Sequence, residues 1–238
     1  MSRSLLLFLG ISIFFTLTAC ERSNSFEADN MFQGKLAAEL AEATRKGDID
    51  RVKELIVAGA DVKATDQESR TLLWWAMINN QPQTFKLLLE SGADPTTHSS
   101  SGETIVHASA MLNTPEFLKI LLKHGVPVDI ESAGGRTPLF DAFGGGQAKI
   151  LLDHGADINH RNRMNDTPLY EAAALDDYDN VLKLLKSGAD PTVVTKRGST
   201  FQNPLASGPE EHAYTEEARQ KREQIRQWLR AHDIPVEF

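Results

Sequence analysis

Apolar residues recur at helical spacing in short blocks along this chain, and each block ends at a glycine. The clearest block opens with Thr167-Pro168-Leu169, continues through an apolar run over residues 181–185 and closes with Gly188-Ala189-Asp190. Thr can cap a helix, Pro fits its first position, and Gly can adopt the left-handed conformation that ends one. The stretch of about 21 residues from Thr167 to Gly188 is too long for one buried helix of this composition. It predicts two short antiparallel helices joined by a turn.

Both ends of this block repeat in register. The opening threonine recurs at 71, 104, 137, 167 and 200, with intervals of 33, 33, 30 and 33 residues. The closing glycine recurs at 59, 92, 125, 155 and 188, with the same four intervals. Two independent markers that keep one register indicate a solenoid of stacked helix pairs. The polar segments between the pairs are expected to form projecting loops.

This pattern resembles the ankyrin repeat, in which Thr-Pro-Leu-His opens a two-helix body that ends in Gly-Ala-Asp at a period of about 33 residues. The likeness covers roughly residues 34–238, and His107 keeps the histidine of the family. Departures from the histidine or the proline occur at Trp74, Phe140, Tyr170, Leu72 and Ile105. The resemblance implies an all-α fold, an ankyrin-repeat solenoid of about five to six helix-turn-helix units with projecting loops. It also implies a noncatalytic role in protein–protein binding.

The same markers divide the chain into segments. We expect a leader over residues 1–19, a lipidated cysteine and tether over 20–33, and the repeat domain over 34–238. The expected repeats are 34–65, 66–98, 99–131, 132–161 and 162–195, followed by a C-terminal cap over 196–238. The first repeat lacks the Thr-Pro-Leu opening and carries charges suited to an exposed outer face, so it is interpreted as an N-terminal cap.

The repeat pattern loosens after Thr200, and residues 203–211 are expected to form a loop longer than the other turns. A charged segment from Tyr214 to Arg230 comes next. It is expected to form a helix with Ile225, Trp228 and Leu229 on one face. Packing of that face on the fifth repeat would close the stack.

The first twenty residues have the pattern of a secretory leader. Arg3 gives a positive start, and residues 5–17 are almost wholly apolar but too few for a permanent span. Leu17-Thr18-Ala19-Cys20 resembles a bacterial lipobox, in which Cys20 would be acylated and become the first residue of a lipoprotein. An ordinary signal peptide with an incidental cysteine is the alternative. Glu21, where some lipoproteins carry Asp, implies the outer membrane, with the protein on its periplasmic face.

Cysteine content and net charge limit the classes of partner that the chain is expected to bind. Cys20 is the only cysteine among the 238 residues, so no intramolecular disulfide supports the fold. The formal net charge is −8, and removal of the leader with Arg3 makes it −9. An acidic balance argues against nucleic acid, which requires a clustered basic footprint. We expect a monomer that binds another protein and reaches the membrane through a lipid on Cys20.

One group of candidate partner-binding residues lies late on the first helices of the second and third repeats. They are Trp75, Ile78, Asn79, Met111 and Leu112. Trp is enriched among interface hot spots, and Met adapts to irregular surfaces. The alternative is packing between repeats, which we expect for Trp74 and favour for Trp75, and which stays open for Met111 and Leu112.

A second group lies on the projecting loops, whose sequences differ from repeat to repeat. It comprises Glu103, Arg136, Arg161, Arg163 and Met164. Variable loop tips on a constant frame are typical of a binding surface, and equally of unconstrained solvent-facing loops. The three glycines 144–146 mark the place where the fourth repeat is three residues short, and no Gly-Lys-Ser/Thr follows them. We therefore expect a tight turn after a shortened first helix rather than a phosphate-binding loop.

No catalytic motif stands in the sequence: there is no Gly-x-Ser-x-Gly, His-Glu-x-x-His, Cys-x-x-Cys or glycine-rich dinucleotide pattern. We expect no cofactor and no metal. The leading hypothesis is a lipid-anchored binding protein, for instance an immunity protein that neutralises an antibacterial effector such as a secreted lipase. The alternatives are an accessory factor of a periplasmic stress-defence or envelope enzyme, and an enzyme with an unrecognised site.

Overall fold

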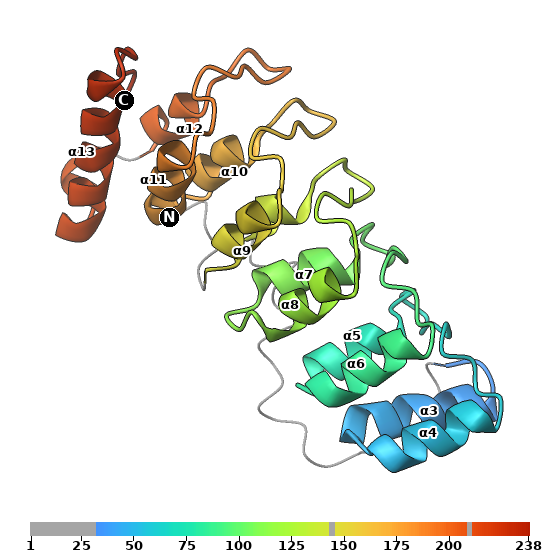
Figure 1. The fold of residues 1–238 in the computed structure, drawn as a ribbon. Helices are drawn as coiled ribbons and strands as arrows, with labels where there is room; N and C mark the ends of the chain where they lie inside the picture. Colours follow the sequence, from blue (N-terminus) through green and yellow to red (C-terminus); the bar gives the residue numbers. More distant parts are fainter. Residues whose placement is uncertain (1–31, 143–145, 209–210) are drawn as a thin grey trace. The chain divides into compact units, whose positions relative to one another are not determined.

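Helices are the regular elements of residues 32–142, 146–208 and 211–238, the part of the chain that the computed structural model describes. They comprise eleven α-helices and two short 3₁₀ helices, and the extended pairing there is an isolated bridge between Thr65 and Thr71. This confirms the expected class, an all-α repeat fold of the solenoid type. The chain divides into two compact units, Met1–Ala93 and Asp94–Phe238, and the labels of Figure 1 are used below.

In the described part of the first unit, two helix pairs pack side by side (Figure 1). They are α3 (Lys35–Lys46) with α4 (Ile49–Val57), and α5 (Leu72–Ile78) with α6 (Pro82–Glu90). Apolar side chains at helical spacing face inward and are almost fully buried: Leu40, Val52, Leu55, Leu72, Phe85 and Leu88. Helix pairing in this unit therefore follows from the apolar stripe of each helix.

The folded part begins earlier than the sequence predicted. Phe32, expected in the tether, is buried, and its ring meets Trp75 edge-on with 5.5 Å between ring centroids. Burial of the apolar Phe32 ring against the second repeat holds the segment that precedes α3 in place. The leader, Cys20 and the tether up to residue 31 lie outside the described residues.

The second unit contains three further pairs and a C-terminal pair of unequal helices. Their bounds are α7 (Ile105–Met111), α8 (Glu116–Lys123), η1 (Pro138–Asp141), α9 (Gln147–Asp153), α10 (Pro168–Ala174), α11 (Tyr178–Lys186), α12 (Gln202–Ala206), η2 (Glu211–Ala213) and α13 (Glu216–Ala231). Within this unit α7 packs on η1, η1 on α10 and α10 on α12, so the first helices of successive repeats are neighbours.

The closing glycines end the second helices as predicted. Gly188 has φ 96°, and the next amide, that of Ala189, donates to the carbonyl of Leu184 at 3.0 Å. The other four glycines of the series also have positive φ, and the residue after each makes the equivalent bond. This left-handed ending satisfies carbonyls that the helix itself leaves open.

The opening threonines cap helices less uniformly than expected. The hydroxyl of Thr167 accepts from the amide of Tyr170 at 3.2 Å, as an N-cap does. Thr104 instead contacts the ring of His107, with 2.9 Å between its hydroxyl and Nδ1. The hydroxyls of Thr71 and Thr137 are buried, and neither has a hydrogen-bond partner among the described residues.

The fourth repeat is shortened in its first helix, as the missing three residues predicted. Its opening segment is the four-residue 3₁₀ helix η1, where the other repeats of the second unit between residues 104 and 186 have seven-residue α-helices. Residues 143–145 lie outside the described residues, and Gly146 begins α9 with φ 87°. The three missing residues therefore shorten the part of the repeat before α9, and α9 keeps its apolar face and its glycine ending.

The C-terminal segment closes the fifth repeat. Ile225 and Leu229 of α13 are fully buried, and α13 packs on α11, which confirms the expected docking. Trp228 is half-buried and stacks on His232 with 3.9 Å between ring centroids. The segment from Asn203 to Glu211 was expected to be a loop, and this was wrong for its first residues, because Gln202–Ala206 form α12. Asn203 explains the difference, because its side-chain oxygen accepts from the amide of Thr200 at 2.6 Å and so starts the turn.

Candidate protein-binding surface

The projecting loops share one closing hydrogen bond. The amide at the loop entrance donates to the carbonyl four residues later, at 2.8 to 3.0 Å, in all five loops. The entrance residues are Asp66 in the first unit and Ser99, Ser132, Asn162 and Thr195 in the second. Small polar residues suit these positions, because their side chains accept from amides of the same turn. Each loop is therefore a built hairpin-like turn.

Neighbouring loops of the second unit are joined to one another by backbone bonds. Ala133 donates to the carbonyl of Gly102 at 2.7 Å, Arg163 to Gly134 at 3.2 Å, and Lys196 to Met164 at 3.0 Å. In this unit the loops project from the same end of the helix pairs (Figure 1). The bonds align four loop tips in a row, and a binding surface there would lose little backbone entropy on contact.

Arg161, Arg163 and Met164 lie on one of these tips, and all three side chains are exposed. Neither arginine has an ion-pair partner among the described residues. The pKa of the nearby Asp190 is lowered, chiefly by hydrogen bonds from Thr192 and to a smaller extent by the positive charge of Arg161. The geometry leaves these three side chains available to a partner.

Trp75 is not available in this way. Its side chain is 6% exposed, its ring meets Phe32, and its Nε1 donates to a carboxylate oxygen of Asp66 at 3.3 Å. The carboxylate of Asp66 also accepts a hydrogen bond from Nε of Arg70 at 2.8 Å. Of the two alternatives for Trp75, the structure shows packing rather than an exposed anchor, since its indole joins a loop to the core. Trp74 is buried as expected.

The neighbouring candidates on α5 are half-buried. The side chain of Asn79 donates to the carbonyl of Trp75 at 2.8 Å and so covers the last turn of the helix. Ile78 has part of its side chain in solvent. In the second unit, Met111 is exposed at the end of α7, whereas Leu112 is half-buried and its carbonyl accepts from the side chain of Gln147.

Arg136 is held in place rather than displayed on a loop tip. Its guanidinium contacts Asp141 at 2.7 Å and Glu171 at 2.8 Å, and it lies over the ring of Phe140, 5.2 Å from the centroid. Burial would lower the pKa of Arg136, but the two carboxylates outweigh it and the pKa is raised. The interpretation of Arg136 as a solvent-facing tip residue is corrected, because this side chain links the fourth repeat to the fifth.

Glu103 belongs to the same group. Its carboxyl is half-buried, and burial together with the negative charge of Asp141 raises its pKa, against the opposing effect of Arg136. Asp141 is 5% exposed, and its Oδ2 has no hydrogen-bond partner in the described part of the chain. Three carboxylates around one guanidinium leave this face of the second unit locally acidic.

His107 is fully buried and contacts the backbone of Arg136. Nε2 of its ring lies 2.9 Å from the carbonyl of Arg136, and Nδ1 lies near Thr104. Burial is the largest cause that lowers the pKa of His107, so the ring is held neutral. The histidine that the family pattern keeps therefore couples the third repeat to the loop of the fourth.

Sequence reasoning missed two cations on the next tip, Lys196 and Arg197, which were assigned to the C-terminal cap. Both are exposed, and the backbone bond between Lys196 and Met164 sets them beside the arginine tip. The signal was present in the register, since Lys196 follows Arg163 by the repeat interval of 33 residues.

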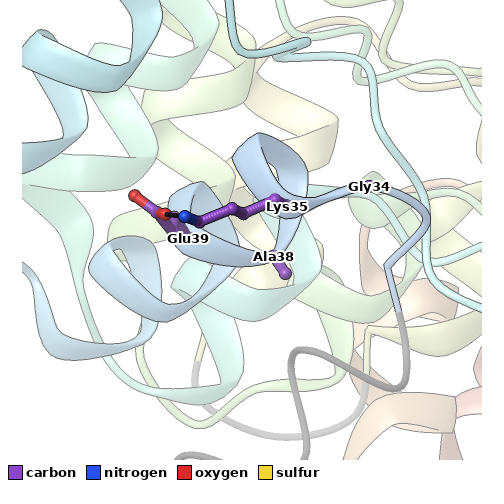
Figure 2. A pocket seen from close by; sticks show the side chains of 4 residues that line it. All are labelled: Gly34, Lys35, Ala38 and Glu39. Atoms are coloured by element: carbon purple, nitrogen blue, oxygen red, sulfur yellow. Dashed lines mark ion pairs between the residues drawn. The ribbon is translucent and has the colours of Figure 1, made fainter.

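We also searched the described residues for a metal site, a membrane-spanning helix and a pocket. No group of three or more His, Cys, Asp or Glu residues there could hold a metal ion. None of the helices that the structure describes is both long and apolar enough to cross a bilayer. A depression of about 500 Å³ lies beside the first turn of α3 and is lined by Gly34, Lys35, Ala38 and Glu39. Figure 2 shows these four residues. The Lys35–Glu39 pair across the depression, 4.0 Å long, gives it no catalytic arrangement.

Helix pairs with a common glycine ending and aligned loops define a helical-repeat binding module. A family model for ankyrin repeats (3 copies) matches residues 40–132, 79–162 and 113–195. The chain belongs to the ankyrin-repeat family, whose repeats are noncatalytic modules that bind other proteins.

Similar curated proteins share only short stretches with this chain. Human palmitoyltransferase ZDHHC13 is 36% identical over 69 residues, which is 29% of this chain and 11% of that protein. Palmitoyltransferase Hip14 of Drosophila melanogaster is 43% identical over 51 residues, 21% of this chain and 8% of that protein. The putative palmitoyltransferase ZDHHC13 of Danio rerio is 46% identical over 48 residues, 20% of this chain and 7% of that protein. The chain thus spans about a tenth of these relatives, and the likeness lies in their ankyrin regions.

Proposed function

We propose that this chain is a lipid-anchored protein that binds one partner protein at the periplasmic face of the outer membrane and has no catalytic activity of its own. The observation that carries the binding role is the bonded row of loop tips in the second unit, with Arg161, Arg163 and Met164 exposed on it. The anchor rests on the lipobox-like residues Leu17-Thr18-Ala19-Cys20. The reaction of the palmitoyltransferases is not carried over, because only repeat regions are shared.

Among binding roles we favour neutralisation of an incoming antibacterial effector. A protein that must meet a toxin before it acts benefits from being held at the membrane, and a short tether would keep its binding surface there. A tether of about ten residues reaches at most ~35 Å.

The test is capture of the partner by the full chain from an envelope extract that includes secreted proteins of neighbouring strains. Arg161→Glu combined with Arg163→Glu should weaken that capture at least about tenfold, because charge reversal at an interface opposes both encounter and binding. Lys119→Glu with Lys123→Glu is the matched control, since both lysines are exposed on α8. If both variants capture the partner equally well, Arg161 and Arg163 do not belong to the interface.

The captured protein decides between the two roles. An immunity protein should abolish its partner's activity when the two are mixed in equal amounts. Preserved or increased activity of a resident envelope enzyme would instead support an accessory factor. Turnover of lipid or peptidoglycan by the purified chain alone would contradict a noncatalytic role.

A further inference from the structure

Two adjacent loop tips of the second unit form one cationic surface. It consists of Arg161, Arg163 and Met164 on one tip and Val194, Lys196 and Arg197 on the next, and it is called the tip surface below. The amide of Lys196 donates to the carbonyl of Met164 at 3.0 Å, and the side chain of Asn165 donates to the carbonyl of Val194. These two bonds fix the tips side by side.

The four cations of the tip surface are exposed and have no ion-pair partner within the described ranges. Two carboxylates that precede these loops accept hydrogen bonds from their own turns. Asp157 accepts from the amide of Asn159 at 2.9 Å, and Asp190 accepts from the amide and hydroxyl of Thr192 at 2.8 and 2.6 Å. Both carboxylates stay charged, but they lie outside residues 161–164 and 194–197, which hold four cations and no carboxylate. In a chain of net charge −8, the tip surface is therefore a local excess of positive charge.

Apolar side chains lie among these charges. Met164 is 40% exposed and Val194 is 46% exposed, and both belong to the few large apolar residues that the described residues leave in solvent. An exposed thioether or branched side chain adds contact area to an interface without a desolvation penalty. The tip surface thus offers cations for orientation and apolar atoms for burial.

The backbone of the tip surface is already ordered. The side-chain oxygen of Asn162 accepts from the amides of Met164 and Asp166 at 2.8 and 2.9 Å. The hydroxyl of Thr195 accepts from the amides of Arg197 and Ser199, both at 3.3 Å. A partner would therefore order side chains alone, which lowers the entropic cost of binding.

We propose that the tip surface binds an acidic segment of the partner protein, in which carboxylates flank one or two apolar side chains. This inference rests on the proposed function and names the chemistry of its partner. Charges are screened beyond about 8 Å at physiological salt, so a short acidic segment experiences the local cations. An extended polyanion, such as nucleic acid or an anionic membrane, would also meet the acidic remainder of the chain.

The test uses the full chain in mild detergent and a fluorescent twelve-residue peptide of glutamates with two central leucines. Anisotropy should show binding that weakens several-fold when salt rises from about 0.05 to about 0.3 M, as expected for screened charges. Lys196→Glu with Arg197→Glu should reduce affinity at least about tenfold, whereas the Lys119→Glu, Lys123→Glu control should change it less than about twofold.

Two further variants separate charge from contact area. Met164→Ser with Val194→Ser should lower affinity while leaving the salt dependence unchanged. Lys196→Arg should bind like the unaltered chain, because the positive charge is kept. All variants should retain the circular dichroism and melting curve of the unaltered chain, since they change exposed side chains and keep the backbone bonds.

Several outcomes would overturn the proposal. They are absence of peptide binding, equal loss in the tip and control variants, or equal binding of a lysine peptide of the same length. Preferred binding to vesicles with about one fifth phosphatidylglycerol, lost in the tip variant, would show instead that the surface meets lipid. Capture of a partner that survives reversal of the tip surface would keep the proposed function and reject this inference alone.

Discussion

At the scale of single residues, the second unit depends on a few buried polar contacts that join repeats. Arg136 bridges Asp141 and Glu171, and His107 meets the carbonyl of Arg136. Asp141 and His107 are almost fully buried. A buried charge that loses its partner costs far more than an exposed one, so these residues should matter to stability beyond their number.

Arg136→Ala should destabilise the protein by about 2–4 kcal/mol, because it leaves the buried Asp141 carboxylate and Glu171 without their cation. Urea unfolding followed by circular dichroism measures this loss. Lys149→Ala is the control, since it breaks an exposed pair with Asp153 of 2.8 Å, and exposed pairs contribute at most about 1 kcal/mol. A loss no greater for Arg136→Ala than for Lys149→Ala would contradict the bridging role.

His107 should make stability fall in mild acid. Its pKa in the folded protein lies below the ordinary value of 6.5, mainly because the ring is buried. As the pH falls below about 6.5, the unfolded chain takes up this proton before the folded chain does, so folding is disfavoured by up to about 1.4 kcal/mol per pH unit. The contribution is fully present above pH 6.5.

His107→Asn should lower stability at pH 7 by about 1–2 kcal/mol through lost hydrogen bonds and should flatten the fall between pH 6.5 and 5. Urea midpoints at several pH values give both quantities. Parallel pH profiles for the variant and the unaltered protein would show that His107 does not titrate as described.

The sequence could predict some of these residues and not others. Arg161 and Arg163 are exposed as expected because loop tips are set by the repeat register. Arg136 stands at the register position of Glu103, yet it bonds Asp141 of its own repeat and, once the fifth repeat packs on the fourth, Glu171 as well. The sequence left packing of Trp75 as one alternative but did not show which groups cover it, because Phe32 and Asp66 lie in an expected tether and an expected free loop.

At the scale of elements, periodicity and glycine endings predicted the helix pairs well, since both markers act within one repeat. The short helix α12 was missed because Pro204 and the loosened pattern suggested a loop, whereas Asn203 and Thr200 start the turn. The position of the three-residue loss was predictable, but the 3₁₀ geometry of η1 was not, because the missing residues indicate where the helix is shortened and not how it is wound.

The helix α13 should act as the stabilising end of the second unit. Leu229→Ala should cost about 2–4 kcal/mol, because Leu229 is fully buried and its loss leaves a cavity. It should also speed amide exchange in α11, on which α13 packs. Gln224 is exposed on the same helix, so Gln224→Ala should leave both the stability and the amide exchange in α11 unchanged. Unaltered exchange in α11 after Leu229→Ala would contradict the docking of α13.

At the scale of the whole molecule, family membership establishes a binding module, and the anchor and the compartment are proposals from the first twenty residues. Repeats of this kind place function on surfaces rather than in a cavity, so the partner must be found by experiment.

Cys20→Ser should abolish incorporation of labelled fatty acid and leave a soluble or unprocessed protein. Cys20 is the only cysteine of the chain, so no other thiol can take its place. The variant should keep the melting temperature of the folded repeats, because the change lies outside them. Continued labelling of the variant would contradict the lipoprotein proposal.

The central claim is that the loop tips of the second unit bind another protein. Site-specific photo-crosslinking in the living cell tests it most directly, with the photoreactive residue placed at Met164 and, as the control, at Lys119 on α8. We expect one discrete adduct of a second protein from position 164 that is absent from position 119. No adduct at 164, or the same adducts from both positions, would contradict the account.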